Sequence, residues 1–116
     1  FCNDALLLNN YGRICDSSIA NVYMIKDNRI YTPSLQEGCI AGVMRKFLIE
    51  HLPLLGYTIE ETQITEEMIN TADEVFISNS IFNIRWVGHI GSYEFANKKI
   101  IDMVNALHEA YPEVFY

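Results

Sequence analysis

The stretch "DSSIANVYMIKDNRIYT", from Asp16 to Thr32, decides the fold class. Two apolar runs, Ile19–Ile25 and Arg29–Thr32, flank the pair Asp27-Asn28, and this order predicts a β-hairpin closed by a tight turn. A plain hairpin needs only alternation and a turn. This one opens with Asp-Ser-Ser and carries Asn21 in its first strand, so its polar residues call for a chemical explanation.

Strands and helices alternate along the rest of the chain. Helical spacing begins at Val43 and should end or kink at Pro53, because proline lacks an N–H and clashes with the preceding turn. Thr65 is expected to cap a short helix, and the segment Tyr93–Tyr111 has the apolar stripe of a longer one. Further strands are predicted over residues 4–9, 57–64, 73–80 and 83–87. The apolar face of the first helix is predicted to consist of Val43, Phe47, Leu48 and Leu52. The pattern indicates an α/β (α+β) domain with a mixed sheet and flanking helices.

Composition narrows the class of protein. The 116 residues include 8 Lys and Arg and give a net charge of −7, which disfavours a nucleic-acid partner. Three cysteines without a CxxC spacing argue against zinc and against a disulfide framework, and they fit a reducing cytoplasm. The three histidines lack the spacing of a metal site or a triad, and no apolar run reaches the length of a membrane span.

Three polar points follow or precede apolar elements. Asp16 with Ser17 and Ser18 lies before the hairpin, Ile40–Arg45 ("IAGVMR") leads into a helix, and Ser78–Ser80 ("SNS") follows a strand. Each alone is ordinary turn, cap or loop chemistry. Together they supply a carboxylate, the free N–H groups of a helix start and hydroxyls, which would suit a phosphorylated, cationic ring.

The combined pattern resembles a known signature. It is similar to that of the class IV aminotransferase family, the fold-type IV pyridoxal-phosphate enzymes, in Asp16-x-Ser18-x-x-Asn21-Val22-Tyr23, Ile30-x-Thr32 and Ile40-x-Gly42-Val43-x-Arg45. "DALLLNNYGRICD" and "TADEVFISNSIFNIRWV" extend the resemblance over nearly the whole chain. It implies the fold of the C-terminal domain of a D-amino-acid aminotransferase-like enzyme, spanning residues 1–116.

The resemblance also implies roles for individual residues. Asp16 stands where the family usually has Glu, whose carboxylate pairs with the protonated ring nitrogen of pyridoxal 5′-phosphate. The N–H groups of Val43 and Met44 would hold the phosphate. Met44 stands where the family usually has Thr, so the side-chain hydroxyl contact of that Thr is absent here. Ser80 would offer a hydroxyl to the phosphate, and the N–H of Ile81 would face phosphate or substrate carboxylate.

One part of the family's machinery lies outside this pattern. The Schiff-base lysine and a phosphate-binding arginine are expected upstream of Asp16, in an N-terminal domain, and the chain's lysines match no catalytic position. The 116-residue piece alone is therefore not expected to turn over substrate. Family members are generally homodimers with the site near the subunit interface. Tyr23, Phe82 and Trp86 are candidates for that surface or for the core.

The turn after the third polar point bears on the reaction. "SNSIFNIRWV" looks closer to aminodeoxychorismate lyase, which converts 4-amino-4-deoxychorismate to 4-aminobenzoate and pyruvate for folate synthesis in the cytoplasm. A branched-chain or D-amino-acid aminotransferase, acting on another amino-acid-like small molecule, is the alternative. A non-catalytic domain that retains the fold is a third reading, and the departures at Asp16 and Met44 favour it.

Overall fold

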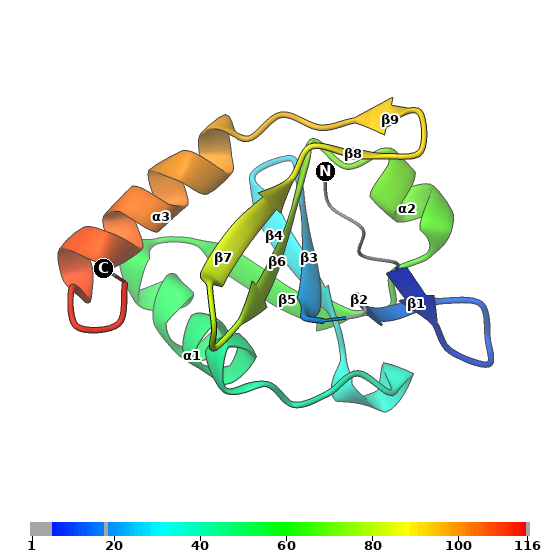
Figure 1. Cartoon of the computed structure of the whole chain (residues 1–116), viewed down its shortest axis with the longest axis horizontal. Helices are drawn as coiled ribbons and strands as arrows, with labels where there is room; N and C mark the ends of the chain where they lie inside the picture. Colours follow the sequence, from blue (N-terminus) through cyan, green and yellow to red (C-terminus); the bar gives the residue numbers. More distant parts are fainter. Residues whose placement is uncertain (1–5, 18, 116) are drawn as a thin grey trace.

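A five-stranded mixed sheet forms the centre of the molecule (Figure 1). The computed structural model describes residues 6–17 and 19–115. The strands lie in the order β5-β4-β3-β6-β7, with β4 and β5 parallel and the other neighbours antiparallel. Their bounds are β3 Asn21–Lys26, β4 Arg29–Pro33, β5 Thr58–Thr62, β6 Glu74–Asn79 and β7 Asn83–Val87. The predicted fold class is confirmed.

The predicted hairpin is formed by β3 and β4. Lys26 pairs with Arg29, which leaves Asp27 and Asn28 as a two-residue connection. Both have left-handed backbones, with φ of 51° and 65°, and Asp and Asn tolerate this conformation better than most residues. The turn chemistry read from the sequence therefore fixes the register of the central hairpin.

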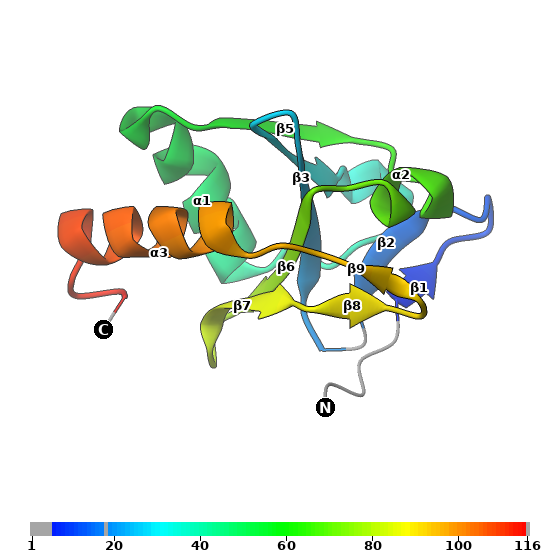
Figure 2. The ribbon, with the colours of Figure 1, turned by 90° about the horizontal axis from the view of Figure 1, so that it is seen from above.

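The sheet separates two apolar cores. Successive residues of a strand point to opposite faces, so Tyr23 and Ile25 face one core while Val22 and Met24 face the other. The first core lies under helices α1 (Val43–His51) and α3 (Lys98–Ala110). The second faces the opposite layer, as both ribbon views show (Figures 1 and 2). That layer comprises β1 Leu6–Leu8, β2 Ile14–Ser17, α2 Glu66–Asn70, β8 His89–Ile90 and β9 Tyr93–Glu94.

The start of α1 corrects one prediction. Val43 was expected on the apolar face, but it is 80% exposed at the first position of the helix. The row at Met44, Leu48 and Leu52 faces the core instead, because the helix lies on the sheet through residues spaced by four. An end or kink was predicted at Pro53; the helix ends two residues earlier, at His51, and Pro53 lies in a short 3₁₀ turn, Leu52–Leu55.

Two element boundaries also differ from prediction. The last helix begins at Lys98 rather than Tyr93, because Tyr93 pairs with Ile90 in the small β8–β9 hairpin. Asp16 lies inside β2 rather than in a turn, paired with Leu7 of β1. The predicted strand over residues 4–9 is found as β1, with residues 4 and 5, like Ser18 and Cys2, outside the described residues.

Side-chain caps fix two helix starts. The hydroxyl of Thr65 accepts a hydrogen bond from the N–H of Met68 at 3.1 Å, as predicted for the cap of α2. The buried carboxylate of Glu74 accepts from the N–H groups of Lys99 and Ile100 at 2.9 and 2.8 Å, which ties α3 to β6. In the described part of the chain, every helix is too short or too polar for a bilayer crossing.

Candidate functional site

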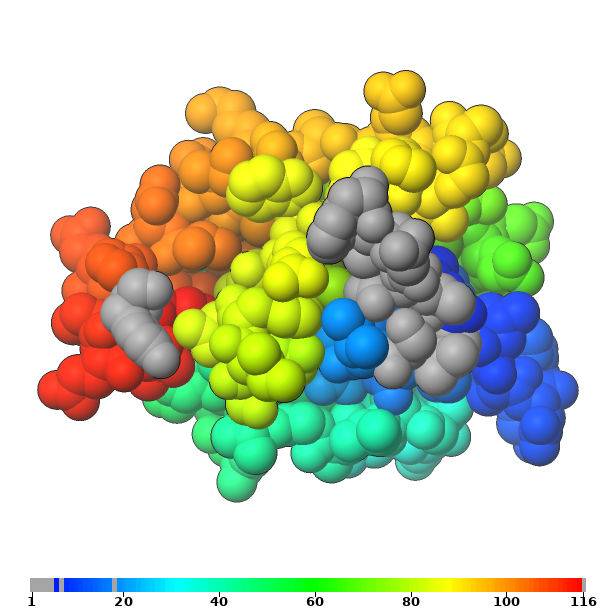
Figure 3. All heavy atoms as spheres, viewed as in Figure 1, coloured from blue at the N-terminus to red at the C-terminus, as the bar shows by residue number. Residues whose placement is uncertain are grey.

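A pocket of about 270 Å³ opens at one end of the central sheet. Four segments meet there: the end of β2, the start of β3, the connection from β4 to α1, and the turn after β6. In the space-filling view the β4–α1 connection (teal) runs along the lower edge of the visible face (Figure 3). The lining residues are Asp16, Ser17, Ile19, Ala20, Asn21, Ile40, Gly42, Val43, Ser78, Asn79 and Ser80.

Asp16 is the carboxylate of the pocket. It is 6% exposed, and its Oδ1 accepts from Nδ2 of Asn21 at 2.9 Å while its Oδ2 accepts from the N–H of Ile40 at 2.8 Å. Burial raises the pKa of the Asp16 carboxyl, opposed by these two hydrogen bonds and by the nearby charge of Arg45. The carboxylate is thus partly desolvated but held in one orientation by donors.

Asn21 is the residue whose function sequence reasoning missed. Its Nδ2 donates to Asp16 and also to the carbonyl of Ile40 at 2.8 Å, so one amide group joins β2, β3 and the β4–α1 connection. The sequence singled out Asn21 as unusual in an apolar strand, but its partner Ile40 lies 19 residues away along the chain. Only the three-dimensional arrangement reveals that contact.

Gly42 is required at the start of α1 because of Asn21. Its φ is −68°, which any residue adopts, but a Cβ at this position would collide with Oδ1 of Asn21. Glycine is therefore required here by the close approach of a neighbouring side chain and not by the backbone conformation.

The first turn of α1 borders the pocket through Gly42 and Val43. Gly42 is the N-cap and offers no side-chain cap, so the N–H groups of Val43 and Met44 have no partner within the helix. Val43 lines the pocket, whereas the side chain of Met44 is 6% exposed and packs in the first core. Met44 itself does not line the pocket, and its predicted contribution through the backbone N–H stays a prediction.

The turn after β6 supplies hydroxyls. Ser78 is fully buried, and its Oγ lies 2.6 Å from the hydroxyl of Tyr23. Burial raises the pKa of Tyr23, so its hydroxyl keeps its proton. Ser80 is exposed and lines the pocket. The structure therefore brings Asp16, Val43 and Ser80 to one cavity, and their roles toward a cofactor stay predictions.

Ile81 stands apart from the pocket. Its side chain is 89% exposed and does not line the cavity, and its N–H donates to Oδ1 of Asn79 at 2.9 Å. Asn79 also accepts from the N–H of Phe82 at 3.0 Å, so it closes the turn by itself. The predicted role of Ile81 toward a ligand stays a prediction. It requires the Ile81 N–H to break its hydrogen bond to Asn79 or to share it with the ligand.

A buried cation lies near Asp16. Arg45 is 5% exposed and donates to the carbonyl of Pro33 at 3.1 Å and to Oε1 of Glu61 at 2.6 Å. Among the residues that the structure describes, no lysine lines the pocket. Residues 6–17 and 19–115 contain no group of three or more His, Cys, Asp or Glu side chains that could hold a metal ion.

Comparison with known proteins agrees with this arrangement. The family model for "Amino-transferase class IV" matches residues 1–90. The aminodeoxychorismate lyase of Vibrio harveyi is 33% identical over 91 residues, covering 78% of this chain and 34% of that protein. The mitochondrial branched-chain-amino-acid aminotransferase 1 of Arabidopsis thaliana is 36% identical over 73 residues, covering 63% of this chain and 19% of that protein.

Solved structures give the same result at the level of the fold. The 4-amino-4-deoxychorismate lyase of Pseudomonas aeruginosa superposes with a TM-score of 0.84 at 25% identity, covering 94% of this chain and 41% of that one. This chain thus spans about a third of the length of the first curated relatives, as the 34% share of the Vibrio lyase shows. Since the family model covers most of the sequence, the chain belongs to the class IV aminotransferase family.

Proposed function

We propose that this chain forms one wall of the cofactor site of a pyridoxal-phosphate-dependent enzyme. Class IV aminotransferases use pyridoxal phosphate. The observation that carries the proposal is one pocket lined by the held carboxylate of Asp16, by Gly42 and Val43 at a helix start, and by serine residues. This donor set fits a cofactor that has a cationic ring nitrogen at one end and a phosphate at the other.

Each residue has a distinct task in this proposal. Asp16 accepts the hydrogen bond of the protonated ring nitrogen, while Asn21 and Ile40 keep its oxygens oriented. The N–H groups of Val43 and Met44 bind the phosphate at the positive end of the helix dipole, and the Ser80 hydroxyl adds a further donor. When bound, the cofactor supplies an electron sink for a carbanion at the substrate's α-carbon.

The activity belongs to the whole protein. The chain corresponds to 34% of the Vibrio lyase, so we place the lysine that carries the cofactor in another part of the natural polypeptide. The substrate is proposed to be an amino-acid-like small molecule and the assembly a homodimer, as implied by the family. By itself the piece described by this sequence is expected to be inactive.

Within the family we favour the lyase reaction, 4-amino-4-deoxychorismate to 4-aminobenzoate plus pyruvate. Support comes from the turn Ser78–Ser80 and the apolar Ile81 that follows it. A branched-chain or D-amino-acid aminotransferase is the second candidate, because the Arabidopsis aminotransferase is 36% identical and the Vibrio lyase 33%. The Asp16 and Met44 departures support the third, a non-catalytic domain.

Two measurements on the protein in its full natural length test this proposal. Incubation with pyridoxal phosphate should give an adduct that borohydride reduces to a stable form. Absence of the adduct would exclude the enzyme and leave the non-catalytic domain. If the adduct forms, release of 4-aminobenzoate and pyruvate from 4-amino-4-deoxychorismate supports the lyase, whereas amino-group exchange with branched-chain keto acids and no such release would assign the aminotransferase.

A further inference from the structure

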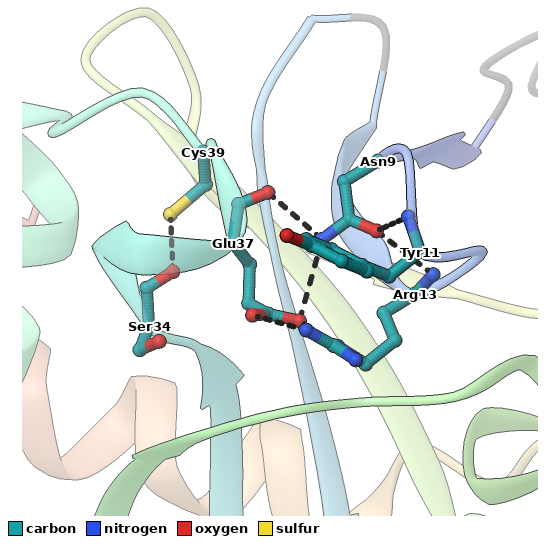
Figure 4. A network of polar contacts seen from close by, with 6 residues as sticks. All are labelled: Asn9, Tyr11, Arg13, Ser34, Glu37 and Cys39. Carbon is teal, nitrogen blue, oxygen red and sulfur yellow. Dashed lines mark hydrogen bonds and ion pairs between the residues drawn. The ribbon is translucent and has the colours of Figure 1, made fainter.

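A second polar contact joins the two segments that meet at Asp16. Glu37 lies at the end of the 3₁₀ turn Leu35–Glu37 and forms a two-pronged ion pair with Arg13 of the β1–β2 connection (Figure 4). Oε1 lies 2.5 Å from Nε of Arg13 and Oε2 lies 3.2 Å from a terminal guanidinium nitrogen. Planar two-point pairing of this kind fixes orientation as well as distance.

The surroundings of Glu37 hold it in place. The residue is 5% exposed, and Nδ2 of Asn9 donates to its backbone carbonyl at 3.1 Å. The guanidinium of Arg13 in turn lies 4.7 Å from the centre of the Tyr11 ring. The hydrogen bonds from Arg13 lower the pKa of the Glu37 carboxyl, so the pair is charged at neutral pH. This is a built contact rather than a chance meeting of surface charges.

The spacing of this contact relates it to the pocket. Arg13 precedes Asp16 by three residues, and Glu37 precedes Ile40 by three. The ion pair and the bond from the Ile40 N–H to Asp16 therefore tie the same two segments at neighbouring points. Between Glu37 and Ile40 the chain passes Gly38, whose φ of 95° lies in the left-handed region that glycine adopts readily.

We infer that Arg13 and Glu37 are positioning residues for the cofactor pocket: their ion pair sets the register of the β4–α1 connection on β2, and so holds the N–H of Ile40 on Asp16. The same connection leads into the first turn of α1, so the pair also places the backbone donors of Val43. The expected effect on cofactor binding rests on the proposed function. The expected effect on the hydrogen bond from the Ile40 N–H to Asp16 is independent of it.

Hydrogen exchange of single amides tests the inference in the unliganded, full-length protein. Glu37→Gln keeps the shape of the side chain and removes its charge. We expect the Ile40 amide to exchange at least about tenfold faster than in the wild type, because local opening at that bond becomes easier. Glu74→Gln is the matched control, because it also neutralises a buried carboxylate. Glu74 accepts hydrogen bonds from two backbone N–H groups and lies four residues from Ser78 along β6, outside the pocket lining. The control should leave the Ile40 rate unchanged.

The outcomes separate positioning from general stability. An unchanged Ile40 rate in Glu37→Gln, or an equal acceleration in both variants, would overturn the inference. If Glu37→Gln fails to fold, Arg13→Lys retains the charge, loses the two-pronged geometry, and is expected to give a smaller acceleration at Ile40, whereas no acceleration there would overturn the inference.

Binding of pyridoxal phosphate is then measured on the same proteins. Weaker binding in Glu37→Gln than in Glu74→Gln supports the link to the pocket, and equal affinities would overturn that link. A wild-type protein that does not bind pyridoxal phosphate would overturn the proposed function, while the Ile40 exchange result would still decide the positioning role.

Discussion

At the scale of single residues, the pocket depends on a carboxylate that is costly to bury. Asp16 is largely shielded from water, and among the described residues 6–17 and 19–115 its hydrogen-bond donors are two neutral groups, the Asn21 amide and the Ile40 N–H. One terminal nitrogen of the nearby cation, Arg45, donates to the Pro33 carbonyl and to Glu61. Such a carboxylate gains most from a ligand that brings its own positive charge and N–H donor.

Gly42 and Asn21 provide a direct test of this local packing. Gly42→Ala should lower the free energy of unfolding by about 1–3 kcal/mol, because the added Cβ meets Oδ1 of Asn21 and the backbone itself is unstrained. In an Asn21→Ala background the same change should cost less, since the obstructing atom is gone. Chemical denaturation of the four proteins in this cycle measures the coupling, and fully additive losses would contradict the steric explanation.

The pH dependence of cofactor binding follows from Asp16. Its pKa is raised by burial, so the folded protein holds this proton more tightly than the unfolded chain, and the free energy of unfolding falls as pH rises between the two pKa values. The ionised form is the one that attracts a cationic ring. Affinity for pyridoxal phosphate should therefore decline as pH is lowered through that pKa.

Asp16→Asn is the reference for this titration. It removes the ionisable group but leaves the titration of the cofactor's own phosphate, so the difference between the two binding curves isolates Asp16. Spectroscopic titration of the full-length protein at a series of pH values gives both curves. Parallel curves for wild type and Asp16→Asn would show that the carboxyl has no part in binding.

The site residues differ in how far the sequence could predict them. The residues themselves indicated three polar points at element ends, and the family resemblance selected the individual positions. Of these, Asp16, Val43 and Ser80 line the pocket, whereas Met44 and Ile81 do not. The contacts of Asn21 and of the Tyr23–Ser78 pair could not be predicted, because their partners lie 19 and 55 residues away. Sequence spacing carries no information about which distant polar atoms meet in the folded chain.

At the scale of elements, local sequence signals were sufficient where the contacts that define a turn or a helix start join residues close in sequence. The β3–β4 hairpin and the cap of α2 depend on residues within a few positions of each other, and both were predicted. β2 was missed because its strand character comes from β1 and from a bridge between Ile14 and Ile64, fifty residues away along the chain. The start of α3 was predicted at Tyr93 and lies at Lys98 for a similar reason, since Tyr93 pairs with Ile90 in the β8–β9 hairpin.

The cap of α2 gives a prediction for one element alone. Thr65→Ala should destabilise the protein by about 0.5–2 kcal/mol, because the N–H of Met68 loses its side-chain acceptor. Thr65→Ser keeps the hydroxyl and should restore most of that loss. Thermal unfolding monitored by circular dichroism compares the three proteins. Equal losses in the Ala and Ser variants would assign the effect to the threonine methyl group rather than to the cap.

At the scale of the molecule, the helix-covered core and the pocket lie at different places on the central sheet. The helices α1 and α3 cover one face of the sheet, and the pocket lies at the sheet end, where β2, β3, the β4–α1 connection and the β6 turn meet. Around that opening, Ile19, Ile40 and Val43 are 52%, 75% and 80% exposed. In the whole protein we expect further polypeptide to cover this apolar rim, since the Vibrio relative is matched over only 34% of its length.

The most direct test of the account is the affinity of the full-length protein for pyridoxal phosphate when Asp16 is changed. Asp16→Ala should weaken binding at least about tenfold, the loss expected when a charge-assisted hydrogen bond worth roughly 1.5–3 kcal/mol disappears. Asp73→Ala, a half-exposed carboxylate paired with surface lysines, should leave the affinity unchanged. Wild-type affinity in Asp16→Ala would contradict the claim that this carboxylate receives the cofactor's ring nitrogen.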